Sequence, residues 1–145
     1  MIIDSHCHLT YEPMSLKIDE TINQANKEGV KFILTISTED KSYDKILNII
    51  SNHKCVYGTY GIHPHEAKNH RTLKFNKILE RVNLNKKIIG IGETGLDFYY
   101  NHSAKAEQIK CFEEHIEAAQ NTNKPIIFCL KLLPGHVVTV LKSHQ

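Results

Sequence analysis

The chain opens with MIIDSHCH, residues 1–8, and this stretch predicts both the first strand of the fold and a candidate metal site. Its apolar start predicts a buried strand, and alternate residues of a strand point to the same face. His6 and His8 therefore share a face, with Asp4 on the same side. Two neighbouring imidazoles can bind one divalent cation, and the Asp4 carboxylate can orient the rings or share their protons through hydrogen bonds. The same spacing also fits two polar residues in a turn without a ligand.

Composition limits the classes of protein to which the chain can belong. Its 145 residues, 41% of them hydrophobic, suit one domain with a core. The net charge of +2 is spread along the chain and predicts no general attraction to nucleic acid or membranes. No apolar run is long enough to span a bilayer, and no signal peptide is apparent. The four cysteines form no C-x-x-C pair, so we expect reduced thiols and a cytoplasmic protein.

Apolar runs rich in β-branched residues alternate with segments of helical periodicity. Strands are predicted at 31–37, 56–62, 88–92 and 126–128, and helices at about 18–28, 40–50, 73–82 and 104–120. The segment 38–40 has the composition of a helix cap. Repeated strand–helix–strand units make right-handed crossovers and produce a parallel sheet covered by helices. The predicted fold class is α/β.

Polar side chains follow several of these strands. His63 and His65 come directly after the third strand, and Glu93 comes after the fourth. Ligands of parallel sheets bind beyond the carboxyl ends of the strands, where we expect these residues to meet His6 and His8. A carboxylate there can bind one cation or bridge two. The sequence thus predicts an open metal site made of two imidazoles and the Glu93 carboxylate.

At these residues the sequence resembles the TatD family of metal-dependent hydrolases, the TatD DNase family. The matching motifs cover nearly all of residues 1–128 in the family's order. They are DSHCHL at 4–9, GIHP at 61–64, GIGETGLDFYY at 90–100, the helix carrying Gln108, Phe112 and His115, and KPII at 124–127.

The resemblance implies a TIM-like (β/α) barrel with one to three divalent cations, Zn, Mg or Mn. It also implies hydrolysis of DNA phosphodiester bonds, a deoxyribonuclease activity with DNA as substrate. In the family's pattern His6 and His8 are metal ligands, Glu93 bridges metals, and His63 faces the substrate pocket.

The chain departs from the family in two respects. Cys129 and Lys131 stand where the fifth strand of the family carries a histidine ligand and an arginine. Cys129 is therefore either a soft ligand or a small buried residue. A full barrel takes about 250 residues, and the family's later half supplies another histidine ligand and an aspartate that activates water. No aspartate follows Asp97 in this chain. We therefore expect the N-terminal half of a barrel at 1–128 and a divergent tail at 129–145.

Three functional hypotheses follow. The chain is an active TatD-type hydrolase, or it is a truncated and catalytically inactive fragment. Alternatively it is a half-barrel that pairs with a separate second half or with another copy of itself. Membership of the family is common to all three, whereas enzymatic activity of this chain is left open.

Overall fold

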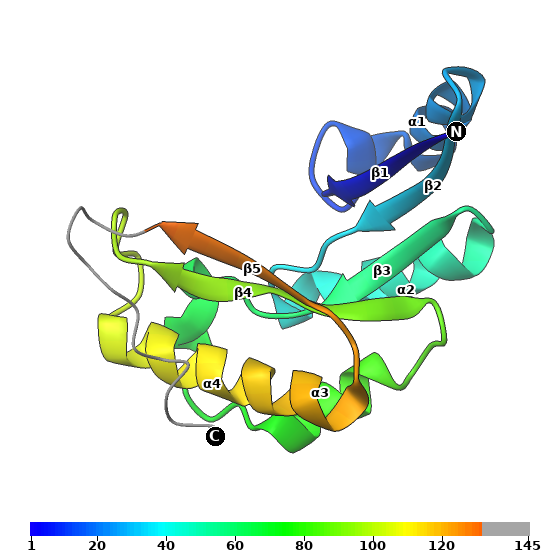
Figure 1. The fold of residues 1–145 in the computed structure, drawn as a ribbon. Coiled ribbons are helices and arrows are strands. Elements are labelled where there is room, and N and C mark those ends of the chain that lie inside the picture. Colours follow the sequence, from blue (N-terminus) through cyan, green and yellow to red (C-terminus); the bar gives the residue numbers. More distant parts are fainter. Residues whose placement is uncertain (132–145) are drawn as a thin grey trace.

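Five parallel strands, joined by helices, form one sheet whose strand order follows the chain (Figure 1). The computed structural model describes residues 1–131. Sequential order is the order of a (β/α) barrel, so the predicted α/β class and half-barrel architecture are confirmed. The elements are β1 (Ile2–Cys7), η1 (Met14–Leu16), α1 (Ile18–Lys27), β2 (Val30–Thr35), α2 (Asp40–Asn52), β3 (Val56–Tyr60), η2 (Pro64–Asn69), α3 (Phe75–Val82), β4 (Ile88–Asp97), α4 (Lys105–Thr122) and β5 (Ile126–Lys131).

The helices cover one face of the sheet and form the core with it. In Figure 1, α3 and α4 lie along the same side of β3, β4 and β5. Helix α2 buries Tyr43, Ile46 and Ile50, which share one face of the helix, in a cluster that includes Val56 of β3. Burial of such side chains is worth about 1.5–3 kcal/mol each.

The predicted cap of α2 is wrong. The N-cap residue is Glu39, which makes no side-chain capping hydrogen bond. The neighbouring side chains bind elsewhere, because the Thr38 hydroxyl pairs with the Tyr11 hydroxyl at 2.6 Å and the Asp40 carboxylate accepts a hydrogen bond from the Tyr60 hydroxyl at 3.1 Å. Tertiary contacts have replaced the local cap.

Two strands also differ from their predictions. Strand β1 was expected to be buried, but Ile2 and Ile3 are 54% and 55% exposed, because among residues 1–131 this edge strand pairs only with β2. Strand β4 was expected to end at Gly92, but it continues to Asp97. Its extension pairs with β5, with Leu96 opposite Leu130. That long-range pairing leaves no mark in the local sequence.

Buried hydroxyls join the carboxyl ends of β2 and β3 to the middle of β4, where the Thr59 hydroxyl donates to the Gly92 carbonyl. Ser37 donates through its hydroxyl to the Gly61 carbonyl at 3.1 Å, and its backbone N–H donates to the Thr59 hydroxyl at the same distance. The backbones are also in close contact, since a Cβ atom built on Gly61 would lie 2.3 Å from the Gly92 Cα. The segments that carry His63 and Glu93 are therefore held together before any ligand binds.

The predicted boundary after residue 128 falls inside β5, and residues 132–145 of the predicted tail lie outside the described residues. Within residues 1–131, no helix combines the length and the apolar character needed to cross a membrane.

Candidate metal centre

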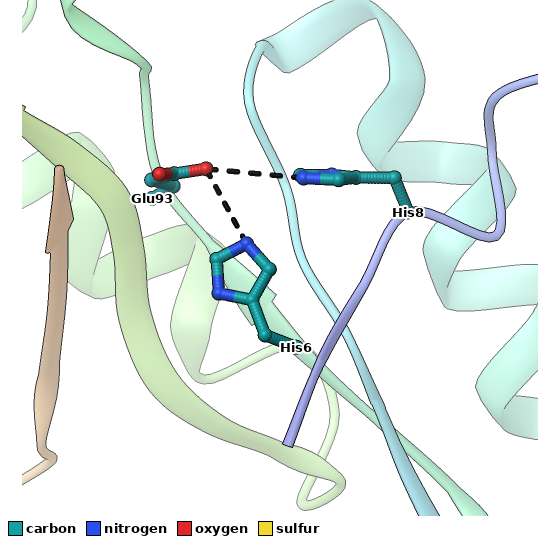
Figure 2. A group of neighbouring side chains, drawn as sticks. All are labelled: His6, His8 and Glu93. Atoms are coloured by element: carbon teal, nitrogen blue, oxygen red, sulfur yellow. Dashed lines mark ion pairs between the residues drawn. The ribbon is translucent and has the colours of Figure 1, made fainter. Parts of the chain in front are cut away.

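His6, His8 and Glu93 meet at the carboxyl edge of the sheet, as the sequence predicted. Figure 2 shows both imidazoles pointing toward the Glu93 carboxylate, although the glutamate lies on a different strand. The Glu93 Oε2 atom is 3.7 Å from His6 Nε2 and 3.9 Å from His8 Nε2. One potential ligand atom from each residue lies within 4.8 Å of the others. We call these three residues the metal cluster.

The spacing of these atoms fits a shared cation better than hydrogen bonds. Hydrogen bonds from imidazole nitrogen to oxygen measure about 2.7–3.2 Å, so 3.7 and 3.9 Å are too long. Two ligand atoms that each lie about 2.0–2.2 Å from one tetrahedral zinc ion are roughly 3.4 Å apart. Nitrogen and carboxylate donors also suit manganese and, through the carboxylate, magnesium. The residues present therefore fit a divalent ion after small side-chain movements.

Neighbouring side chains set the orientation of the cluster. The His8 ring stacks on Tyr11 with centroids 5.0 Å apart, and its Nδ1 atom has no hydrogen-bond partner within residues 1–131. Glu93 is anchored through its backbone N–H, which donates to the Ser37 carbonyl at 2.7 Å. Asp4 accepts a hydrogen bond from the His6 backbone N–H at 3.1 Å. Its role is to fix the backbone at His6, whereas the sequence suggested a contact to the rings.

A cleft of about 280 Å³ opens beside the cluster, and His63 is among the residues that line it. Its walls are polar and include His8, Glu93, His65 and Glu66. A cavity of this size and polarity does not suit a large apolar ligand.

His63 is held as a neutral hydrogen-bond donor. Burial lowers the pKa of His63 to about 4, and the neighbouring His65 adds to the effect. The His63 Nδ1 atom accepts a hydrogen bond from the His65 backbone N–H at 3.3 Å. Because a neutral imidazole carries one proton, that proton is on Nε2. A protonated Nε2 can donate a hydrogen bond to an oxygen atom in the cleft.

Cys129 forms a second group with His63 and Glu93, in which one potential ligand atom from each residue again lies within 4.8 Å of the others. Burial raises the pKa of the Cys129 thiol, and the Glu93 carboxylate raises it further. The thiol would have to lose its proton to bind a metal, which a bound cation itself favours. The Cys129 side chain is only partly buried, so it is not the fully buried small residue that was one of the two expectations.

The sequence reasoning placed His65 at the strand ends near His6 and His8, but it gave no specific role to His65 and did not single out Asp97. Asp97 is fully buried and accepts a hydrogen bond from His65 Nε2 at 2.7 Å. Burial alone would raise the pKa of Asp97, but the Tyr100 N–H and the His65 imidazole hold it below its usual range. The signal available in the sequence was the His-x-His spacing at 63–65, which repeats the spacing at 6–8. Asp97 lies 32 residues after His65 in the sequence, and this position gave no signal that the two side chains would meet.

The family helix motif supports this arrangement from behind the sheet. Gln108 is fully buried and binds Asp97 twice, accepting from its N–H at 2.7 Å and donating to its carbonyl at 3.0 Å. His115 accepts a hydrogen bond from the Ile62 N–H at 3.1 Å, directly before His63. Burial lowers the pKa of His115 to about 4, so it stays neutral. Both side chains have structural roles beneath the cleft.

Sequential parallel strands that bring two imidazoles and a carboxylate together are the arrangement of one half of a (β/α) barrel with a candidate metal site. The family model described as "TatD related DNase" matches residues 3–144. The chain belongs to that family. The matched range includes most of the segment that we expected to diverge after residue 128.

Three relatives illustrate the comparison. An uncharacterized metal-dependent hydrolase of Buchnera aphidicola subsp. Baizongia pistaciae is 34% identical over 99% of this chain and 55% of its own length. The 3′-5′ ssDNA/RNA exonuclease TatD of Salmonella typhimurium is 26% identical over 86% of this chain and 48% of its length. The crystal structure of the TatD homologue YJJV from Escherichia coli K12 is 25% identical with a TM-score of 0.77, covering 88% of this chain and 49% of that one. The chain therefore spans about half the length of the relatives it matches.

Proposed function

We propose that the chain provides the metal-binding half of a hydrolase that cleaves DNA phosphodiester bonds. The observation that carries this proposal is the convergence of His6, His8 and Glu93 at a spacing suited to one divalent cation. The curated relatives named as metal-dependent hydrolases support metal use, and the name of the Salmonella relative supports a nucleic-acid substrate. A cytoplasmic location stays a prediction.

The protein's own residues would divide the work as follows. His6, His8 and Glu93 would hold a zinc, manganese or magnesium ion, which supplies Lewis-acid chemistry by polarising a phosphoryl oxygen. His63 would donate its Nε2 proton in a hydrogen bond to a phosphate oxygen in the cleft. Such a donor, fixed before substrate binds, stabilises charge that develops in the transition state.

A second candidate is a half-barrel that becomes active only with a second half or a second copy. The open sheet favours it, because within residues 1–131 both β1 and β5 pair on one side alone. The family's later ligand and its water-activating aspartate would then come from the other half. In this case the chain binds metal but turns over little substrate.

Incubation with labelled single-stranded DNA and manganese tests the proposal. We expect cleavage that is slow compared with the about 1–10³ s⁻¹ of typical enzymes and that is lost with a chelator or in Glu93→Gln. Glu80→Gln is the control, because Glu80 pairs with Lys77 on the exposed face of α3, away from the cleft.

The outcomes separate the two candidates. Metal binding without cleavage would favour the second candidate, a half-barrel that needs a second half or a second copy for activity. Rapid cleavage abolished by Glu93→Gln would show that one half suffices. Cleavage that survives both the chelator and Glu93→Gln would contradict the proposed function.

A further inference from the structure

Tyr100 and His102 form an exposed aromatic surface on the loop after β4. The Tyr100 side chain is 55% exposed, and its ring plane lies within 11° of parallel to that of His102, with centroids 6.0 Å apart. Lys131, the last residue of β5, places its Nζ atom 5.1 Å from the Tyr100 ring centroid. We call Tyr100, His102 and Lys131 the aromatic platform. Core packing does not explain a ring that remains more than half exposed.

A buried carboxylate fixes the platform. Asp97 accepts hydrogen bonds from the Tyr100 backbone N–H at 2.9 Å and from His65 Nε2 at 2.7 Å. The His65 ring in turn stands edge-on to His102, with centroids 4.5 Å apart, and to Tyr100, at 6.0 Å. The loop and the imidazole are thus tied to one carboxylate that is itself fully buried. Such preorganisation reduces the entropic cost of binding a ligand.

His65 connects the platform to the cleft. It lines the cleft together with Glu93, and its ring lies 4.4 Å from that of His63. The same imidazole therefore borders both the pocket and the exposed rings. A polymer with one phosphate at the metal cluster would next meet the platform.

The chemistry of the platform matches a nucleotide. Aromatic rings beside a cation are typical of single-strand binding sites, where bases stack on the rings and basic residues contact the phosphates. Within a duplex, the faces of each base are already stacked on its neighbours. An exposed flat ring therefore favours a single strand or a frayed end.

We propose that the aromatic platform is a nucleotide subsite for single-stranded nucleic acid. It would stack one base on Tyr100 and His102, next to the nucleotide whose phosphodiester lies at the metal cluster. Lys131 would contact a neighbouring phosphate. The inference rests on the proposed function and names the residues that select the substrate.

Fluorescence anisotropy with two labelled oligomers tests the subsite. One is a short oligothymidylate, and the other is an abasic backbone with the same number of phosphates. In the presence of Mn²⁺ we expect the wild-type chain to bind the oligothymidylate roughly tenfold more tightly, the effect of about one stacked base. Tyr100→Ala/His102→Ala should remove this preference and leave binding of the abasic oligomer unchanged. Tyr100→Phe, which keeps the ring, should retain the preference.

Metal titration of the same proteins separates the two claims. Wild type and Tyr100→Ala/His102→Ala should bind Mn²⁺ equally, and circular dichroism should show that the variant remains folded. Absence of metal binding by the wild type would defeat the proposed function. Normal metal binding with a base preference that is absent in the wild type, or unchanged in Tyr100→Ala/His102→Ala, would overturn the subsite alone.

Discussion

Glu93→Gln should lower the affinity of the chain for zinc or manganese by roughly 100-fold or more. Loss of a residue that only hydrogen-bonds a metal ligand typically costs about 10–100-fold in metal affinity, and loss of a ligand should cost at least as much. The Glu93 Oε2 atom is the point toward which His6 and His8 both turn. Glutamine keeps the size of the side chain but removes its charge, and neutral amides are weak ligands for these ions. Isothermal titration of metal into the purified proteins measures the change.

Glu66→Gln is the matched control for this titration. It makes the same chemical change in the same cleft, but the Glu66 carboxylate accepts a hydrogen bond from Asn69 at 2.8 Å and belongs to neither candidate metal group. Its metal affinity should stay within a few-fold of wild type. Equal losses in both variants would mean that the cleft binds cations only through its general negative charge.

The isolated chain should self-associate or be poorly soluble. Within residues 1–131, β1 and β5 each leave one edge unpaired. Apolar side chains on these strands are also exposed, among them Ile3 at 55% and Phe128 at 54%. An open strand edge is a template for pairing with another chain, and pairing of edges between two copies would also bury these apolar side chains. Sedimentation velocity should detect dimers or larger species at micromolar concentration.

A charge on the sheet edge should weaken this association. Natural edge strands use lysine to prevent pairing, so Ile3→Lys is expected to shift the population toward monomer. Leu84→Lys is the control, because Leu84 is 54% exposed but lies outside the sheet. A wild-type chain that sediments as one monomer and melts in a sharp transition would show that its edges are already covered.

Local periodicity and strand-end chemistry predicted much of the architecture. The apolar stripe on α2 and the alternation of strands and helices were sufficient for the parallel α/β class. The convergence of His6, His8 and Glu93 followed from a general property of parallel sheets, in which the carboxyl ends of the strands gather at one edge. None of these inferences required knowledge of a specific long-range contact.

The features that the sequence did not reveal depend on such contacts. The extension of β4 to Asp97 arises from pairing with β5, and the Asp97–His65 hydrogen bond joins the end of β4 to η2. The exposure of Ile2 also depends on which strands lie next to β1. An apolar residue in a strand looks the same in the sequence whether its face is covered or open.

X-ray absorption spectroscopy of the zinc-loaded chain tests the central claim most directly, because it reports the atoms bound to the metal. The expected spectrum shows two imidazole nitrogens and carboxylate oxygen at about 2.0–2.2 Å, with the imidazole signal lost in His6→Ala/His8→Ala. A sulfur at about 2.3 Å would instead place the ion at Cys129. An imidazole signal that persists in His6→Ala/His8→Ala would show that the metal binds elsewhere and would contradict the assignment of the site.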